Sequence, residues 1–168
     1  MVIVYFIKIQ ENLEVKNESD LFSTKPLNKL ALDANDPTFT KETLHIRLKG
    51  RKIPIKEALL NQEIIAGLGN IYVDEVLFAS RISPLREACD VSCTECGIIL
   101  EESRKILNKA ISYKGTTIRS YTSSLGVIGE FQNFLCVHTK EICPICKGEI
   151  TKTRISGRGT YYCARCQK

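Results

Sequence analysis

The sequence lacks any long apolar run. No stretch approaches the roughly 20 consecutive apolar residues that a membrane-spanning helix requires,. It also lacks a charged start followed by an apolar segment and small residues, which is the pattern of a secretory signal,. These two absences argue against a membrane protein and a secreted protein. We expect a soluble, cytoplasmic protein that makes no use of a membrane.

Acidic residues are scarce in the last part of the chain. Between Cys143 and Lys168 there is a single acid, Glu149, so this stretch has a net charge of +5, equal to the +5 of the whole chain. Positive charge concentrated on one small module is typical of a phosphate-binding surface. The alternative is a solvated face, but such faces usually interleave acids with bases. The six basic residues are Lys147, Lys152, Arg154, Arg158, Arg165 and Lys168.

The chain is long enough to bury a core. It has 168 residues, of which 43% are hydrophobic, and this length fits one domain or a domain with a small added module,. Its eight cysteines fit a reducing compartment in which half of them hold a metal,.

Four of the cysteines form two Cys-x-x-Cys pairs, Cys143 with Cys146 and Cys163 with Cys166. Pairs at this separation can bring four thiolates around one tetrahedral Zn²⁺, so we expect a structural zinc ribbon with one ion. The alternatives are disulfides or buried thiols, but a Cys-x-x-Cys disulfide closes a small, strained loop. We expect the hairpin between the pairs to turn on glycines with positive φ: Gly148, Gly157 and Gly159.

The first residues predict one strand without a partner. Residues 2–9 are β-branched and aromatic, and residues 10–25 are polar,. A lone strand needs a sheet for its backbone groups, and no second strand precedes the helical region, as in a truncated domain. Turn-forming residues within 26–43 predict a linker with a short helix after it.

Helical patterns begin near residue 41. Residues 41–48 predict one helix, and a second begins near Pro54 with apolar positions 58–60,. Gly67, Gly69 and Asn70 predict a tight turn, with Asn70 as the cap of a helix over 71–80. The pattern is a helix, two turns and a helix. The N–H groups at the start of its second helix would bind an anion such as a DNA phosphate, although most glycine turns only reverse the chain.

One further helix is predicted from its ends. Ser92 and Glu95 have the spacing of a capping box, and Gly115 ends the helix. Its buried stripe would consist of Ile99, Leu100, Ser103, Ile106, Leu107, Ala110 and Ile111,.

Three other cysteines lie close together in the sequence, at Cys89, Cys93 and Cys96. They could form a second metal site or a redox pair. We favour buried thiols, because three cysteines without a fourth ligand make an incomplete zinc site.

Three stretches resemble the formamidopyrimidine-DNA glycosylases, bacterial enzymes that excise oxidised purines. They read IKEALLNQ (55–62), AGLGNIYVDE (66–75) and GRGTYYCARCQ (157–167). The resemblance covers the chain from about residue 25 to its end. It implies double-stranded, damaged DNA as the partner, with the target base flipped out of the duplex.

The resemblance also implies roles for single residues. Asn70 and Arg158 match residues that grip the DNA phosphates, and Lys56 matches a lysine that faces the same backbone. Glu75 matches a glutamate that orders this half of the protein. Arg119 and Tyr121 belong to a stretch, 117–129, that resembles the mobile loop over the flipped base.

The start of the chain departs from the family. Those enzymes begin with Met-Pro-Glu, whose proline amine attacks the sugar and whose glutamate transfers protons. This chain has Val2 and Ile3 there, and residues 2–9 resemble the last strand of the family's catalytic sandwich. We therefore expect no catalytic residue here and no excision of an oxidised purine by this chain alone.

Together these patterns predict a mainly α fold with three parts. Residues 1–24 would be a remnant strand and linker, 25–135 a helix-two-turns-helix DNA-binding domain, and 136–168 a β-hairpin zinc ribbon. The chain would be the DNA-binding half of a base-excision glycosylase and AP lyase, monomeric and located with the bacterial nucleoid. Two alternatives remain: a zinc-ribbon module without a repair role, and one half of a split enzyme with a separate catalytic domain.

Overall fold

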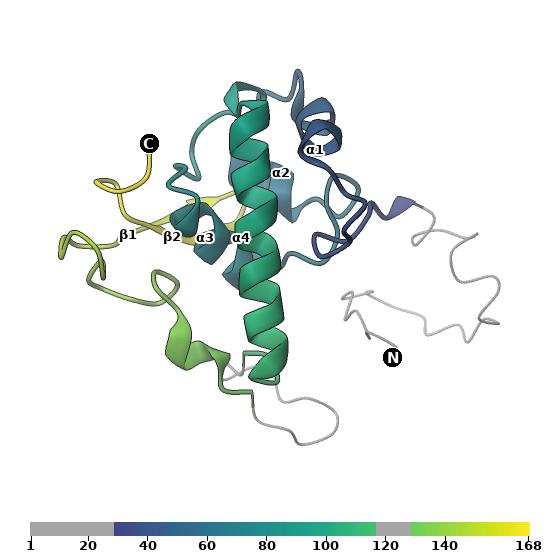
Figure 1. Ribbon diagram of the computed structural model, residues 1–168. Helices are drawn as coiled ribbons and strands as arrows, with labels where there is room; N and C mark the ends of the chain where they lie inside the picture. The colour runs from purple at the N-terminus through teal and green to yellow at the C-terminus, as the bar shows by residue number, and fades with distance from the viewer. Residues whose placement is uncertain (1–28, 117–128) are drawn as a thin grey trace.

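The computed structural model describes residues 29–116 and 129–168. Within them the chain is mainly helical and ends in an antiparallel two-stranded hairpin, which confirms the predicted fold class; the expected strand at 2–9 lies outside the described residues. In Figure 1 the helix α4 runs through the centre, with α1 on one side and the C-terminus on the other. The elements are α1 (Lys41–Leu48), α2 (Ile55–Leu60), α3 (Asn70–Ala79), the 3-10 turn η3 (Ala88–Asp90), α4 (Cys93–Ser112), the 3-10 turn η4 (Phe131–Phe134), β1 (Thr151–Ile155) and β2 (Arg158–Tyr162).

The helix-two-turns-helix forms as predicted, from α2 and α3. Pro54 caps α2, and Gly67 takes a φ of 88° in the connecting turns, a conformation that favours glycine,. Gln62 fixes these turns, since its amide accepts from the N–H of Gly67 at 3.0 Å and donates to the carbonyl of Leu68 at 3.1 Å. This fixed connection sets the direction in which α3 starts.

The predicted linker is partly wrong, because residues in it join the core. Ala34 and Phe39 are buried, and the N–H of Ala34 donates to the carbonyl of Ala66 in the turns between α2 and α3. Turn residues between 33 and 37 suggested a linker, but the apolar side chains around them have a partner in the helices. The largest buried side chains of this core include Phe39, Leu44, Leu48, Leu59, Ile64, Leu77 and Ile99.

Helix α4 has the predicted capping box. Ser92 accepts from the N–H of Glu95, whose carboxylate accepts from the N–H of Ser92 at 2.8 Å,. Most of the predicted stripe faces the core, but Ile111 is 58% exposed. It lies about 100° round the helix from Ala110, which packs with Phe131, so it faces solvent,. In the described ranges 29–116 and 129–168, no helix is long and apolar enough to cross a bilayer.

The ribbon is joined to the helices through α3. Phe78 of α3 packs with Val137 and with the cysteines of the ribbon in one buried cluster. At the C-terminus, the Gln167 side chain donates to the carbonyl of Ile82 and accepts from the N–H of Cys163. The hairpin is therefore held against the end and one side of α3.

Candidate nucleic-acid interface

The four predicted zinc ligands converge. The sulfur atoms of Cys143, Cys146, Cys163 and Cys166 all lie within 4.8 Å of one another, with 3.8 Å between Cys143 and Cys166 and 3.5 Å between Cys146 and Cys163. A tetrahedral zinc with bonds of about 2.3 Å places its sulfurs about 3.8 Å apart. The donor set and its size therefore fit one structural zinc ion.

The thiol pKa values are consistent with a site for a cation. Burial acts to raise the pKa of Cys143, but the N–H groups of Cys146 and Ile145 and the neighbouring thiols outweigh it and lower that pKa to about 7. Burial, then hydrogen bonds with the other three thiols, raise the pKa of Cys166 to about 12. Without a cation, these two thiols therefore differ in how readily they ionise. A zinc ion would hold all four as thiolates.

The other cysteine group does not form a site. In the part of the chain that the structure describes, the four ribbon cysteines are the metal-ligating group that comes together. Cys96 is buried, as predicted, and burial raises its pKa to about 12. Cys89 and Cys93 are only half-buried, so the prediction of buried thiols is wrong for these two.

The hairpin turns sharply at Ser156 and Gly157. Their φ values are 48° and 76°, and Ile155 pairs with Arg158 across them, which is the geometry of a two-residue turn with two positive φ angles,. Of the three glycines expected to have positive φ, only Gly157 does. Ser156 takes the other turn position, and its hydroxyl donates to the carboxylate of Glu57 on α2.

Arg158 follows this turn and is exposed at the tip of the hairpin. The next residue, Gly159, meets the start of α3, because the Asn70 side chain donates to the Gly159 carbonyl at 3.1 Å. Asn70 is the first residue of α3, and Gly69 takes the cap position, so the prediction of Asn70 as the cap is wrong. Its amide is engaged by the hairpin, and its Oδ1 is buried without a hydrogen-bond partner.

This contact joins two features whose chemistry favours a phosphate, the start of α3 and the hairpin segment that carries Arg158. The first N–H groups of α3 have no acceptor within the helix and carry the positive end of its dipole. The guanidinium of Arg158 adds a full charge one residue from the carbonyl that Asn70 holds. A surface of this composition can bind an extended polyanion.

Lys56 is not at this surface, although the resemblance implied that it faces the DNA backbone. Its side chain is fully buried, with Nζ 2.7 Å from Oδ1 of Asp74 and 2.8 Å from the Gly159 carbonyl. Burial lowers the pKa of Lys56, the hydrogen bond and charge of Asp74 act against this, and the nearby charge of Arg158 lowers it further. The lysine therefore stabilises the hairpin from inside the protein, by donating to the Gly159 carbonyl.

Glu75 of α3 is buried as well. Its carboxylate accepts from three consecutive N–H groups, those of Cys136 at 2.7 Å, Val137 at 3.0 Å and His138 at 2.9 Å. These residues lead into the ribbon. The glutamate thus fixes the segment that precedes the first zinc knuckle, which supports the ordering role that the resemblance implied.

Sequence reasoning missed the neighbour of Glu75. Asp74 is buried, and its Oδ2 lies 2.8 Å from Nδ1 of His138 and 3.2 Å from the backbone nitrogen of Tyr161. A signal was present, because two adjacent acids inside an apolar helix are rarely both buried without partners.

The comparisons with known proteins match both parts of the chain. Residues 30–122 match the model of the formamidopyrimidine-DNA glycosylase H2TH domain, and residues 140–168 match the zinc finger found in FPG and IleRS. The first match alone covers more than half of the chain. The chain belongs to the formamidopyrimidine-DNA glycosylase family. The resemblance seen in the sequence is thereby confirmed.

Curated members of the family are similar over only part of their length. The formamidopyrimidine-DNA glycosylase of Ureaplasma parvum is 42% identical over 155 residues, which are 91% of this chain and 56% of that protein. The one from Mycoplasma mobile is 50% identical over 123 residues, 72% of this chain and 45% of that protein. The chain thus spans about half the length of these relatives.

Solved structures agree in fold. The complex between Lactococcus lactis Fpg and an abasic site containing DNA has a TM-score of 0.82 at 35% identity, covering 90% of this chain and 56% of that one. The MutM (FPG) protein of Thermus thermophilus has a TM-score of 0.79 at 34% identity, covering 84% and 55%. Two expected site residues, Arg119 and Tyr121, lie outside the residues that the structure describes.

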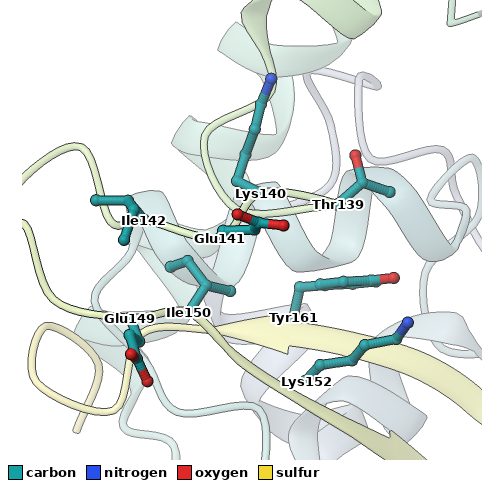
Figure 2. Close-up of a pocket in the computed structure, with 8 residues that line it drawn as sticks. All are labelled: Thr139, Lys140, Glu141, Ile142, Glu149, Ile150, Lys152 and Tyr161. Carbon is teal, nitrogen blue, oxygen red and sulfur yellow. The ribbon is translucent and has the colours of Figure 1, made fainter.

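A separate hollow of about 480 Å³ lies on the ribbon (Figure 2). Its two lysines are offset by two glutamates, so it has no net charge that favours phosphate. Neither Asn70 nor Arg158 lines it, and it is not part of the surface at the hairpin tip. Its lining residues are Thr139, Lys140, Glu141, Ile142, Glu149, Ile150, Lys152 and Tyr161.

Proposed function

We propose that this chain binds double-stranded DNA, and damaged DNA in particular, as the DNA-binding part of a base-excision glycosylase and AP lyase that acts on oxidised purines. The observation that supports it most is the contact between Asn70 and the Gly159 carbonyl. It joins the start of α3 to the hairpin tip that carries Arg158. Phosphates on either side of a lesion would be held by these two elements together.

The distribution of charge supports the same proposal. All six basic residues of the stretch 143–168 are exposed. In the family proteins of known structure, Lactococcus lactis Fpg is bound to an abasic site containing DNA. We propose the same class of ligand here. Arg119 and Tyr121 would belong to the loop that covers a flipped base.

The excision step is proposed for the family protein as a whole. It requires a nucleophilic amine and a proton-transferring carboxylate of the Pro-Glu type, which a separate catalytic domain could supply. We further propose that the chain is a monomer that acts in the cytoplasm at the nucleoid. The division at residues 24 and 135 remains a prediction.

A second candidate is a nucleic-acid module with no role in repair. It is favoured by the zinc-finger match, since that finger is found in IleRS as well as FPG. The two candidates differ in lesion preference. A glycosylase part is expected to bind an abasic-site duplex more tightly than an undamaged one, whereas a general module binds both equally.

The test is a salt titration of binding to these two duplexes. Arg158→Ala is expected to weaken binding at least about tenfold and to reduce the salt slope by about one. Lys105→Ala removes one charge from an exposed, ion-paired site on α4 and serves as the matched control. If Arg158→Ala binds DNA as tightly as the parent does, the proposed DNA-binding surface is wrong.

A further inference from the structure

One carboxylate lies at the centre of the contact between α3 and the ribbon. The Asp74 side chain is fully buried and meets donors from three separate elements: Lys56 on α2, His138 before the ribbon, and the N–H of Tyr161 on β2. A carboxylate can accept several hydrogen bonds at once, so it suits a junction where three elements meet. Neither Asn nor Ser could satisfy the same set.

The contacts of Lys56 connect this carboxylate to the hairpin tip. The lysine shares its amino group between Asp74 at 2.7 Å and the Gly159 carbonyl at 2.8 Å. Asn70 donates to the same carbonyl. The backbone one residue beyond Arg158 is therefore held by two side chains, of which the buried one depends on Asp74 for its orientation and charge.

Burial makes this dependence strong. A buried lysine without its acid is an uncompensated charge, and it leaves its position or loses its proton. The first change removes a donor from the Gly159 carbonyl, and the second leaves a neutral amine, which is a weaker donor than the ammonium group,. A separate hydrogen bond, from the Ser156 hydroxyl to the carboxylate of Glu57, holds the turn that precedes Arg158.

We propose that Asp74 is a positioning residue for DNA binding. Through Lys56 it fixes the Gly159 carbonyl, and thereby holds the backbone that carries Arg158 next to the first residue of α3. It does not touch DNA itself, because it is buried. This inference rests on the proposed function, in which Arg158 holds a phosphate.

The test is a double-mutant cycle on the affinity for an abasic-site duplex. Asp74→Asn, which keeps the shape and removes the charge, is expected to weaken binding at least about tenfold and to lower the salt slope by about one. Because it acts through Arg158, adding Asp74→Asn to Arg158→Ala is expected to cause no further loss. As the control, Lys105→Ala is added to Asp74→Asn, and the two losses of binding free energy are expected to add.

Zinc content and the thermal melting curve show whether the variants fold. If Asp74→Asn does not fold, the pair Lys56→Met with Asp74→Asn also removes the buried ammonium charge, and the Asn oxygen still offers an acceptor to His138 and the Tyr161 N–H,. This folded pair is expected to lose DNA affinity as Asp74→Asn does, because the donor to Gly159 is gone.

The outcomes separate the two proposals. If Arg158→Ala has no effect on binding, the proposed function fails whatever Asp74 does. If Arg158→Ala weakens binding but a folded, zinc-loaded Asp74 variant binds like the parent, the positioning role is overturned. The positioning role is also overturned if the double variant loses affinity by the product of the two single losses, since Asp74 would then act independently of Arg158.

Discussion

The helical part and the ribbon are stabilised by different interactions. The helices bury one continuous apolar cluster that draws side chains from α1, α2, α3 and α4. The ribbon has a far smaller cluster, in which the zinc ligands Cys143 and Cys163 supply much of the apolar contact. The helices can therefore fold by apolar burial, whereas the ribbon depends on its metal and on polar contacts with α3. The proposed DNA surface needs both parts.

Removal of zinc is expected to have the largest effect, and to affect the ribbon but not the helices. Structural zinc in small ribbons contributes about 10 kcal/mol or more to folding, so chelation is expected to unfold residues 143–166 while the helices remain. Circular dichroism would retain the helical signal, and DNA affinity would fall to the level of non-specific binding. A protein that keeps its full affinity after verified zinc loss would contradict this view of the ribbon.

A cavity in the helical core should destabilise the helices and leave the zinc-bound ribbon intact. Leu77 of α3 is 1% exposed within the helical cluster, and Leu77→Ala is expected to destabilise the helices by about 2 to 5 kcal/mol,. Denaturant unfolding followed by circular dichroism measures this loss, and zinc content measured below the transition should not change. Leu85→Ala, at a side chain that is 50% exposed, is the control.

Glu75 tests the connection between the parts. Glu75→Gln replaces one carboxylate oxygen by an NH₂ group that faces backbone N–H donors, and it is expected to cost about 1 to 3 kcal/mol. Hydrogen exchange should increase at residues 136–138, with zinc retained. Exchange that is unchanged at those three amides would show that the glutamate does not order this segment.

The smallest expected effect is a pH dependence that belongs to the helices alone. Hydrogen bonds from Arg86 lower the pKa of Glu95 to about 2, and bonds from Ser92 add to this. Because the folded pKa lies below the ordinary value of 4.5, the stabilisation is complete above about pH 4.5 and is lost as the pH falls toward 2,. Thermal melts of the parent and Glu95→Gln should differ by about 1 kcal/mol at pH 7 and converge near pH 2. A stability difference between the two proteins that is the same at pH 7 and at pH 2 would contradict the assignment of this pH dependence to Glu95.

Local features of this molecule could be predicted from the sequence. The zinc ligands and the capping box of α4 depend on spacings of three residues, which the chain order fixes directly. The connection of α2 to α3 is local as well.

The features that were missed join distant parts of the chain. Asn70 was taken as a cap, but its side chain has a partner 89 residues away. The pairing of Asp74 with His138 spans 64 residues, and lysines such as Lys56 are rarely fully buried,. No local pattern specifies such contacts, although the two adjacent acids in α3 indicated that partners must exist.

The most direct test of the central claim is an NMR titration of the zinc-loaded, ¹⁵N-labelled chain with an abasic-site duplex. If the start of α3 and the hairpin tip form one DNA-binding surface, the amides of residues 69–72 and 157–159 will shift together and saturate at the same DNA concentration. Shifts confined to one of these segments, or centred on the hollow lined by residues 139–142, 149, 150, 152 and 161, would contradict it.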